Sequence, residues 1–185
     1  MLRVIAGEAR RLQLKSIEGK DTRPTLDRIK ETVFNVIQPD IYGTTFVDLF
    51  SGTGQMAIEA LSRGAAYAYL VEMNKKAVGV INYNLEHTKY LDKSEVMAVD
   101  VNTAIRRLSD KGVVADYIYI DPPYQAGLEE RVLGELDRSS LLGPDTLVIV
   151  EADLHTDFDF IDNYGLVISR VKEYKSNKHI FITRK

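Results

Sequence analysis

From Thr44 onward the chain alternates short β-branched or aromatic runs with helical stretches, and this pattern restricts its fold more than any other feature. Such βα units are typical of a largely parallel sheet with helices on both faces. No helical pattern separates residues 166–171 from 180–183, so these two runs predict an antiparallel hairpin added to the sheet. The sequence thus predicts a seven-stranded, doubly wound α/β fold. The five earlier strands are expected at 45–50, 66–71, 95–99, 117–120 and 146–150, with helices at 55–63, 75–87, 103–108 and 127–136.

The first 43 residues do not follow this alternation. Residues 2–14 alternate loosely around a candidate turn at Gly7, which favours a hairpin. A helix is predicted over 26–37, because apolar side chains recur there at the spacing of one helical face. We therefore expect one globular domain, in which an N-terminal extension, residues 1–43, packs against a core, residues 44–185.

Charge is distributed unevenly along the 185 residues. The formal net charge of −3, from 24 Lys and Arg against 27 Asp and Glu, by itself argues against a polyanionic partner. However, residues 1–38 carry +3 and residues 164–185 carry +5, whereas residues 39–163 carry −11. Basic ends are compatible with nucleic acid if the fold brings them onto one face.

The chain has no cysteine and no long apolar run. The first absence excludes a disulfide framework and a thiolate zinc site. The histidines, His87, His155 and His179, lack metal-ligand spacing, so we interpret them as structural or surface residues and expect no metal. Without an apolar signal segment or a run of about 18 apolar residues, we expect a soluble, cytoplasmic protein that does not contact a membrane.

A glycine turn joins the first predicted strand of the core to the helix that follows it. Gly52 and Gly54 allow a ligand to approach the backbone, and the free N–H groups of the helix face the same space. Residues 52–57 also match the G-x-G-x-x-G/A dinucleotide pattern. Because the pattern is short, a turn that only packs strand against helix is the alternative.

Acidic residues at three strand ends favour S-adenosylmethionine over a nicotinamide dinucleotide. Asp48, before the glycine turn, would repel a pyrophosphate but attract a cationic aminoacyl group. Glu72 can accept hydrogen bonds from two ribose hydroxyls, and Asp100 is placed to meet an adenine amino group. Each acid alone also fits an ordinary strand end. Together they mark the carboxyl edge at which open α/β sheets bind ligands.

The tetrapeptide Asp121-Pro122-Pro123-Tyr124 directly follows the fourth predicted strand of the core. Two prolines remove two backbone donors and fix two φ angles, which leaves a rigid turn of hydrogen-bond acceptors. The Asp121 carboxylate and the Pro122 carbonyl can hold the two hydrogens of an exocyclic amine, so that its lone pair points at a methyl group. Tyr124 can stack on the base. The alternative is a structural turn with a packed tyrosine.

Together these segments resemble the bacterial 16S ribosomal RNA guanine-N2 methyltransferases of the RsmD type. The resemblance covers nearly the whole chain from Arg3 to Glu151. Besides the glycine turn and the tetrapeptide, it depends on RVIAG at 3–7, TRPTLDRIKE at 22–31 and IEALSRGA at 58–65. One departure is the sequence of residues 174–178, YKSNK, where members usually have a tyrosine-glycine turn.

The resemblance implies a Rossmann-like, S-adenosylmethionine-dependent enzyme that methylates the N2 amine of one guanine in 16S rRNA, within the small subunit or its precursor. It implies catalytic roles for Asp121, Pro122, Pro123 and Tyr124. The positions that match the cofactor motifs are Asp48, Phe50, Ser51, Gly52, Thr53, Gly54, Glu72, Met73, Asp100 and Val101. The default oligomeric state is a monomer.

Basic side chains of the extension are candidates for RNA phosphate contacts. Such side chains hold the backbone without reading its sequence, and each contact adds salt dependence. For any single residue an ordinary solvated surface is the alternative. The candidates are Arg3, Arg10, Arg11, Arg23, Thr25 and Arg28, with Lys15 and Lys30 in the same basic group.

Three other functions fit parts of the pattern. A DNA or other RNA amino-methyltransferase of the adenine N6 type shares the tetrapeptide, but normally carries a larger target-recognition region. A protein-glutamine methyltransferase favours Asn over Asp at the first position of the tetrapeptide. A nicotinamide-binding module fits the glycine pattern, but leaves Asp121-Pro-Pro-Tyr without a purpose.

Overall fold

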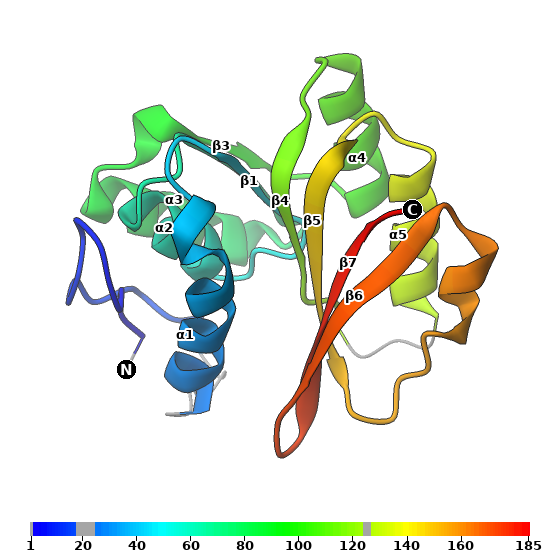
Figure 1. Cartoon of the computed structure of the whole chain (residues 1–185). Coiled ribbons are helices and arrows are strands. Elements are labelled where there is room, and N and C mark those ends of the chain that lie inside the picture. Colours follow the sequence, from blue (N-terminus) through cyan, green and yellow to red (C-terminus); the bar gives the residue numbers. More distant parts are fainter. Residues whose placement is uncertain (1, 18–24, 124–126) are drawn as a thin grey trace.

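The structure of the chain, a computed structural model, describes residues 2–17, 25–123 and 127–185, with only the backbone described at 25–28. Its centre is a seven-stranded sheet in the order β3-β2-β1-β4-β5-β7-β6 (Figure 1). Strands β1 to β5 pair in parallel, and β7 is antiparallel to both β5 and β6. The predicted α/β fold is thus confirmed. The strands are β1 Thr45–Asp48, β2 Tyr67–Val71, β3 Ser94–Met97, β4 Ala115–Ile120, β5 Leu142–Asp153, β6 Leu166–Glu173 and β7 Asn177–Arg184.

Helices cover both faces of the sheet (Figure 1). Successive residues of a strand point to opposite faces, so Phe46 joins one apolar cluster with α1, α2 and α3, and Val47 joins another with α4 and α5. No helix of the described residues is long and apolar enough to cross a membrane. The helices are α1 Thr25–Ile37, α2 Gln55–Ser62, α3 Lys75–Thr88, α4 Val101–Asp110 and α5 Leu128–Asp137, with short 3-10 helices at Gln38–Asp40, Leu91–Lys93 and Asp159–Asn163.

Residues 2–14 fold back on themselves as predicted, but with only one isolated bridge, Arg3 to Gln13, in place of two regular strands. Side chains of α2 take up backbone groups of this segment: the Glu59 carboxylate accepts the N–H groups of Ile5 and Ala6 at 2.9 and 3.0 Å. At Gly7 the φ angle is +82°, and a Cβ there would lie 1.8 Å from the Ser62 carbonyl oxygen. The segment is therefore held both by a few backbone hydrogen bonds of its own, such as those from Val4 to Leu12 and from Leu14 to Leu2, and by its fit to α2.

Helix α1 of the extension packs against the part of the sheet that the C-terminal hairpin forms. Phe181 of β7 packs in one apolar cluster with Val33 and Phe34 of α1. In Figure 1 the N-terminal end of α1 and the turn between β6 and β7 both lie toward the lower edge of the view, where β4 and β5 end. Helix α1 and the hairpin therefore lie side by side, but the exposed Arg10 and Arg11 of the extension lie elsewhere, on a turn bonded to Ser62 of α2.

Candidate active site

The glycine turn and the Asp121 turn leave the sheet side by side. Strands β1 and β4 are neighbours, with Asp48 opposite Tyr119, and the N–H of Leu49 donates to the Tyr119 carbonyl at 3.0 Å. The helices that follow β1 and β4 lie on opposite faces of the sheet. The two turns therefore border the crevice at the point where strand order reverses, which is the usual ligand site of such sheets.

The glycine turn is shaped for a ligand that approaches the backbone closely. Gly52 and Gly54 have φ angles of +55° and +79°, and Gly54 precedes the first residue of α2. A Cβ at Gly52 would meet no atom within 4 Å, so the space above it is open. Nε2 of Gln55 is buried and has no hydrogen-bond partner in the part of the chain that the structure describes. An unused donor of this kind, beside an open backbone, fits a polar ligand.

Asp48 is a buried carboxyl group with no cationic partner among the described residues. Its residue is 1% exposed, and none of the ion pairs among the described residues includes it. Burial, together with the neighbouring Glu72, raises the pKa of Asp48 to about 7, although hydrogen bonds from Phe50 and Ser51 act in the opposite direction. A cationic group placed beside Asp48 would favour its ionised form. The site therefore suits an ammonium ion.

Glu72 connects the end of β2 to the glycine turn. One carboxylate oxygen accepts the N–H of Gly52 at 3.0 Å, and the other accepts the N–H of Asn74 at 2.8 Å. These two bonds fix the orientation of the carboxylate, and each oxygen keeps a second lone pair for a hydroxyl donor. Met73, the next residue, is 74% exposed and offers an apolar surface beside it.

Asp100 has a structural partner that the sequence analysis did not identify. Its oxygens accept the backbone N–H and the hydroxyl of Thr103 at 3.0 and 2.6 Å, so Asp100 is the N-cap of α4. The same hydrogen bonds lower its pKa. Val101 begins α4 and packs against the second apolar cluster. Contact between Asp100 and an adenine amino group stays a prediction.

The turn after β4 presents its acceptors at the open edge. Asp121 and Pro123 are exposed, and Pro122 is buried. Burial raises the pKa of the Tyr119 hydroxyl, and the nearby charges of Glu151 and Asp121 add to this effect. Tyr124 lies outside the described residues, so its stacking role stays a prediction.

The structure separates the candidate RNA contacts into groups. Arg10 and Arg11 are exposed on a turn whose neighbours bond to Ser62, at the end of α2 opposite the glycine turn. A helix of eight residues is about 12 Å long, so these cations lie far from the catalytic edge. Arg3 is also exposed. Arg23 and the side chains of Thr25 and Arg28 lie outside the described set.

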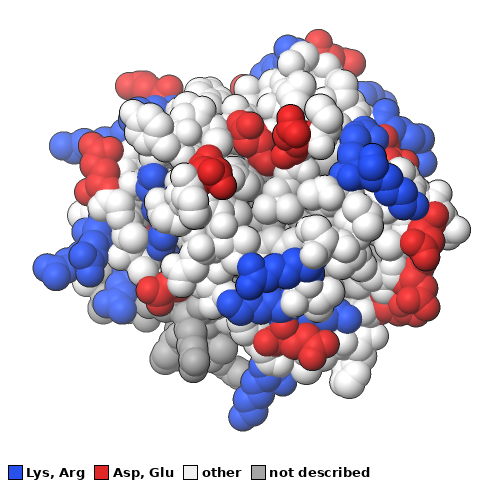
Figure 2. Space-filling view, viewed as in Figure 1, with Lys and Arg blue, Asp and Glu red and all other residues white. Residues whose placement is uncertain are grey.

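The expectation that Lys30 contacts phosphate is wrong. Its side chain is 3% exposed, and its Nζ lies 3.1 Å from a carboxylate oxygen of Glu59 and donates to the Arg3 carbonyl at 2.8 Å. Arg63 completes this buried group with a second ion pair to Glu59 at 2.9 Å. Figure 2 instead shows Lys and Arg side chains over the β6–β7 hairpin. Arg170 and Lys175 are exposed there, and Lys172 is partly exposed.

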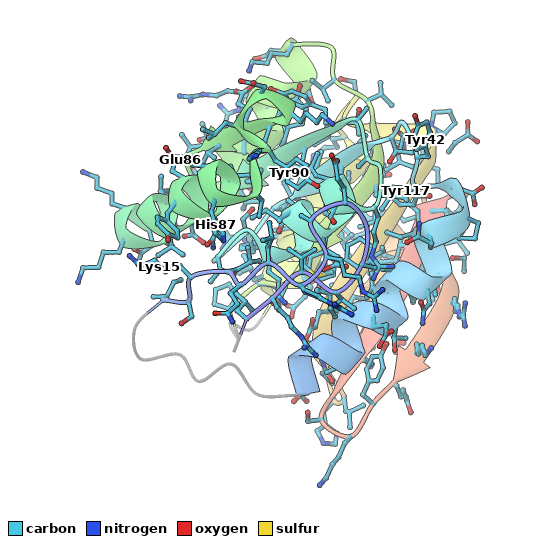
Figure 3. All side chains as sticks on the ribbon, turned by 90° about the vertical axis from the view of Figure 1, so that its left-hand side faces the viewer. Lys15, Tyr42, Glu86, His87, Tyr90 and Tyr117 are labelled. Carbon is cyan, nitrogen blue, oxygen red and sulfur yellow. The ribbon has the colours of Figure 1, made fainter. Side chains whose placement is uncertain are left out.

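Asn84 of α3 is a further residue that the sequence analysis missed. It is fully buried, accepts the Lys15 N–H at 2.7 Å, and donates to the carbonyls of Lys15 and Thr53 at 3.0 and 2.9 Å. Asn84 thus ties the extension to the glycine turn; Figure 3 shows Lys15 beside α3, on the same side as His87. Its position among the buried residues Ile81, Leu85 and Thr88 was the available signal.

Comparison with known proteins connects this geometry to a family. The family model described as conserved hypothetical protein 95 matches residues 2–183. Putative rRNA methyltransferase YlbH of Bacillus subtilis is 32% identical, covering 94% of each chain. Ribosomal RNA small subunit methyltransferase D of Escherichia coli is 33% identical over 83% of this chain and 75% of its own. Among solved structures, a putative methyltransferase, yhhF, from Escherichia coli superimposes with a TM-score of 0.86 and 29% identity, covering 100% of this chain and 98% of that one. The resemblance inferred from the motifs is confirmed.

Proposed function

The chain belongs to the family described as conserved hypothetical protein 95 and is a relative of ribosomal RNA small subunit methyltransferase D, and on this premise we propose that it methylates 16S rRNA. The acceptor is the exocyclic N2 amine of a guanine, and the methyl donor is S-adenosylmethionine. The observation that carries this function is the pairing of β1 with β4. It brings a cofactor-type glycine turn and an acceptor-type Asp-Pro-Pro turn to one crevice.

The residues of the glycine turn fit S-adenosylmethionine, which supplies an electrophilic methyl group on a sulfonium ion. Asp48, buried and unpaired with any cation of the described residues, would hold the ammonium group, and the open backbone at Gly52 admits the ligand. The spare lone pairs of Glu72 suit the ribose hydroxyls. The unpartnered Gln55 donor suits the carboxylate. Phe50, Ser51, Thr53, Gly54, Met73, Asp100 and Val101 complete the proposed cofactor residues.

The Asp121 turn performs the acceptor half of the reaction. The Asp121 carboxylate and the Pro122 carbonyl accept the two amine hydrogens, which directs the nitrogen lone pair toward the methyl group. The nitrogen forms a bond to carbon as the carbon–sulfur bond breaks, and the proton that becomes acidic then leaves to Asp121 or water. Orientation and fixed acceptors carry the rate. No covalent enzyme intermediate is needed.

The proposed partner is 16S rRNA within the small ribosomal subunit or its precursor, in the cytoplasm. Exposed Arg3, Arg10 and Arg11 of the extension are proposed phosphate contacts, together with Arg23, Thr25 and Arg28. We also propose that the protein is a monomer.

Transfer of a tritiated methyl group tests the proposal. Wild-type protein should label 16S rRNA in small subunits or free 16S rRNA, and nuclease digestion should yield N2-methylguanosine. Asp121→Ala should lose at least about 100-fold in rate, since a fixed acceptor at the reacting atom is removed, while it still binds S-adenosylhomocysteine. Label in DNA alone, or as N6-methyladenosine, would establish the alternative amino-methyltransferase.

Calorimetry tests the cofactor half separately. S-adenosylhomocysteine should bind and NAD should not. Because the pKa of Asp48 is about 7 in the free protein, its proton must leave when the ammonium binds, so the Kd should rise about tenfold per pH unit below pH 7. Asp48→Asn should bind weakly with little pH dependence. A wild-type Kd that stays constant between pH 5.5 and 8 would show that Asp48 does not bind the ammonium group.

A further inference from the structure

Behind the Asp121 turn lies a polar cluster that the proposed reaction does not use. Its centre is Glu151 of β5, whose carboxylate accepts hydrogen bonds from three side chains. The Tyr119 hydroxyl of β4 donates at 2.7 Å, and from β7 the Asn177 amide donates at 2.6 Å and the His179 ring at 3.3 Å. The other ring nitrogen of His179 lies 3.0 Å from the Tyr174 hydroxyl.

The cluster is buried and charged. Tyr119, Asn177 and His179 are 3%, 5% and 0% exposed. Burial acts to raise the pKa of Glu151, but the hydrogen bonds from His179, Tyr119 and Asn177 outweigh it, so the carboxylate is ionised. Since a carboxylate only accepts, Nε2 of His179 carries a hydrogen toward Glu151, and Nδ1 is the ring nitrogen that faces the Tyr174 hydroxyl. An apolar core of similar volume is often equally stable, so stability alone does not explain this arrangement.

The position of the cluster links it to the reacting groups. Tyr119 lies two residues before Asp121 on the same face of β4, and Ile120 pairs with Val150, which brings Glu151 level with Asp121. On the other side, Tyr174 bonds to Thr32 of α1. The cluster therefore spans from the β6–β7 hairpin and α1 to the end of the strand that carries the Asp121 turn.

We propose that Glu151 is a positioning residue for the Asp121-Pro122-Pro123 turn, acting through Tyr119, with His179 and Tyr174 holding its carboxylate from the hairpin. Glu151 fixes the Tyr119 hydroxyl, and Tyr119 fixes the end of β4, so the acceptors of the turn keep their distance from the amine. The side-chain hydrogen bonds of Glu151 go to β4 and β7, not to the cofactor residues on β1 and β2. This inference rests on the proposed function.

Three variants test it. Tyr119→Phe and Glu151→Gln each remove part of the link with little change of volume. Tyr117→Phe is the matched control, because Tyr117 lies on the same face of β4 with its ring toward Asp40 and Asp116, away from the cluster. The first two should lower kcat by about tenfold to 100-fold. The KM for S-adenosylmethionine and the Kd for S-adenosylhomocysteine should stay within about twofold of wild type.

A double variant and hydrogen exchange separate positioning from general destabilisation. Tyr119→Phe combined with Glu151→Gln should be no slower than the worse single variant, because both act on one link. Backbone amides of residues 117–121 should exchange faster in both single variants, but not in Tyr117→Phe. Unchanged kcat, fully additive losses, or equal losses in Tyr117→Phe would overturn the inference. If wild type labels no rRNA, the proposed function fails, and the exchange rates still decide whether Glu151 holds the end of β4.

Discussion

The N-terminal extension joins the core through side chains, whereas the C-terminal hairpin joins it through a backbone ladder. Glu59, Ser62 and Asn84 take up backbone groups of residues 5–15. Strand β7 instead pairs with β5 from Val148–Ile182 to Asp153–Asn177. One attachment combines a few buried polar groups with apolar side-chain packing, and the other is spread over many backbone hydrogen bonds.

The two basic ends also differ in where their Lys and Arg side chains lie. In the extension, Lys30 and the core residue Arg63 neutralise buried Glu59. Arg10 and Arg11 lie at the far end of α2 from the glycine turn. In the hairpin, Lys172 and Lys175 lie near the turn between β6 and β7, on the side where β4 and β5 end (Figure 1). A positive segment therefore does not by itself locate an RNA contact.

Glu59→Gln should have the largest effect on stability. It leaves the Lys30 ammonium buried without its carboxylate, which costs about 3–5 kcal/mol of unfolding free energy. Urea unfolding measures this cost. Glu135→Gln is the control, because its ion pair with Arg138 is exposed and contributes little. Equal urea midpoints for the two variants would show that the buried charge does not anchor the extension.

Gly7→Ala should come next, because it combines an unfavourable φ with a collision against Ser62. Gly43→Ala separates the two effects: its φ is +76°, but its added Cβ would meet nothing within 4 Å. The control should lose about 1–2 kcal/mol, and Gly7→Ala should lose clearly more. Limited proteolysis should also release residues before α2 faster in Gly7→Ala. Equal losses would mean that the close approach to α2 has no energetic weight.

Replacing cations at the two ends measures which end meets phosphate. Lys172→Gln with Lys175→Gln should weaken binding to 16S rRNA by about tenfold and reduce the salt slope by about two, one per lost contact. Arg10→Gln with Arg11→Gln is the matched pair in the extension and should have a smaller effect, because of its distance from the catalytic edge. Filter binding across 50–200 mM salt gives both slopes. A larger effect of the Arg10 and Arg11 replacements would show that the RNA phosphates contact the extension rather than the hairpin.

The smallest effect is expected at the end of the hairpin. Asp137→Asn removes the ion pair to Arg184, whose atoms are 3.4 Å apart and partly exposed. Arg184 also donates to the carbonyls of Leu142, Asp137 and Ser139, which remain. The unfolding free energy should fall by less than about 1 kcal/mol. If Asp137→Asn lowered the unfolding free energy as much as Glu59→Gln, the hairpin would depend on a single side-chain ion pair as strongly as the extension does.

Local sequence patterns predicted the elements of the core well. The helix expected at 75–87 is α3, Lys75–Thr88, and the strand expected at 45–50 is β1, Thr45–Asp48. The predicted and observed bounds of an element differ where a polar capping residue or a neighbouring strand determines where the element begins or ends. Asp100 caps α4 at Val101, before the predicted start at 103, and pairing with β4 and β7 extends β5 to Leu142–Asp153.

The sequence by itself determined the order of the elements, the glycine turn and the Asp121-Pro-Pro turn, because periodicity and backbone restriction act over a few residues. Only the tertiary structure decided which polar residues share a site. Lys30 meets Glu59, Asn84 meets Lys15 and Thr53, and Glu151 meets side chains of β4 and β7. His179, interpreted from sequence as structural or surface, is a buried member of that last group. Such contacts join residues far apart in the chain, and no local pattern encodes which distant partner satisfies a buried polar group.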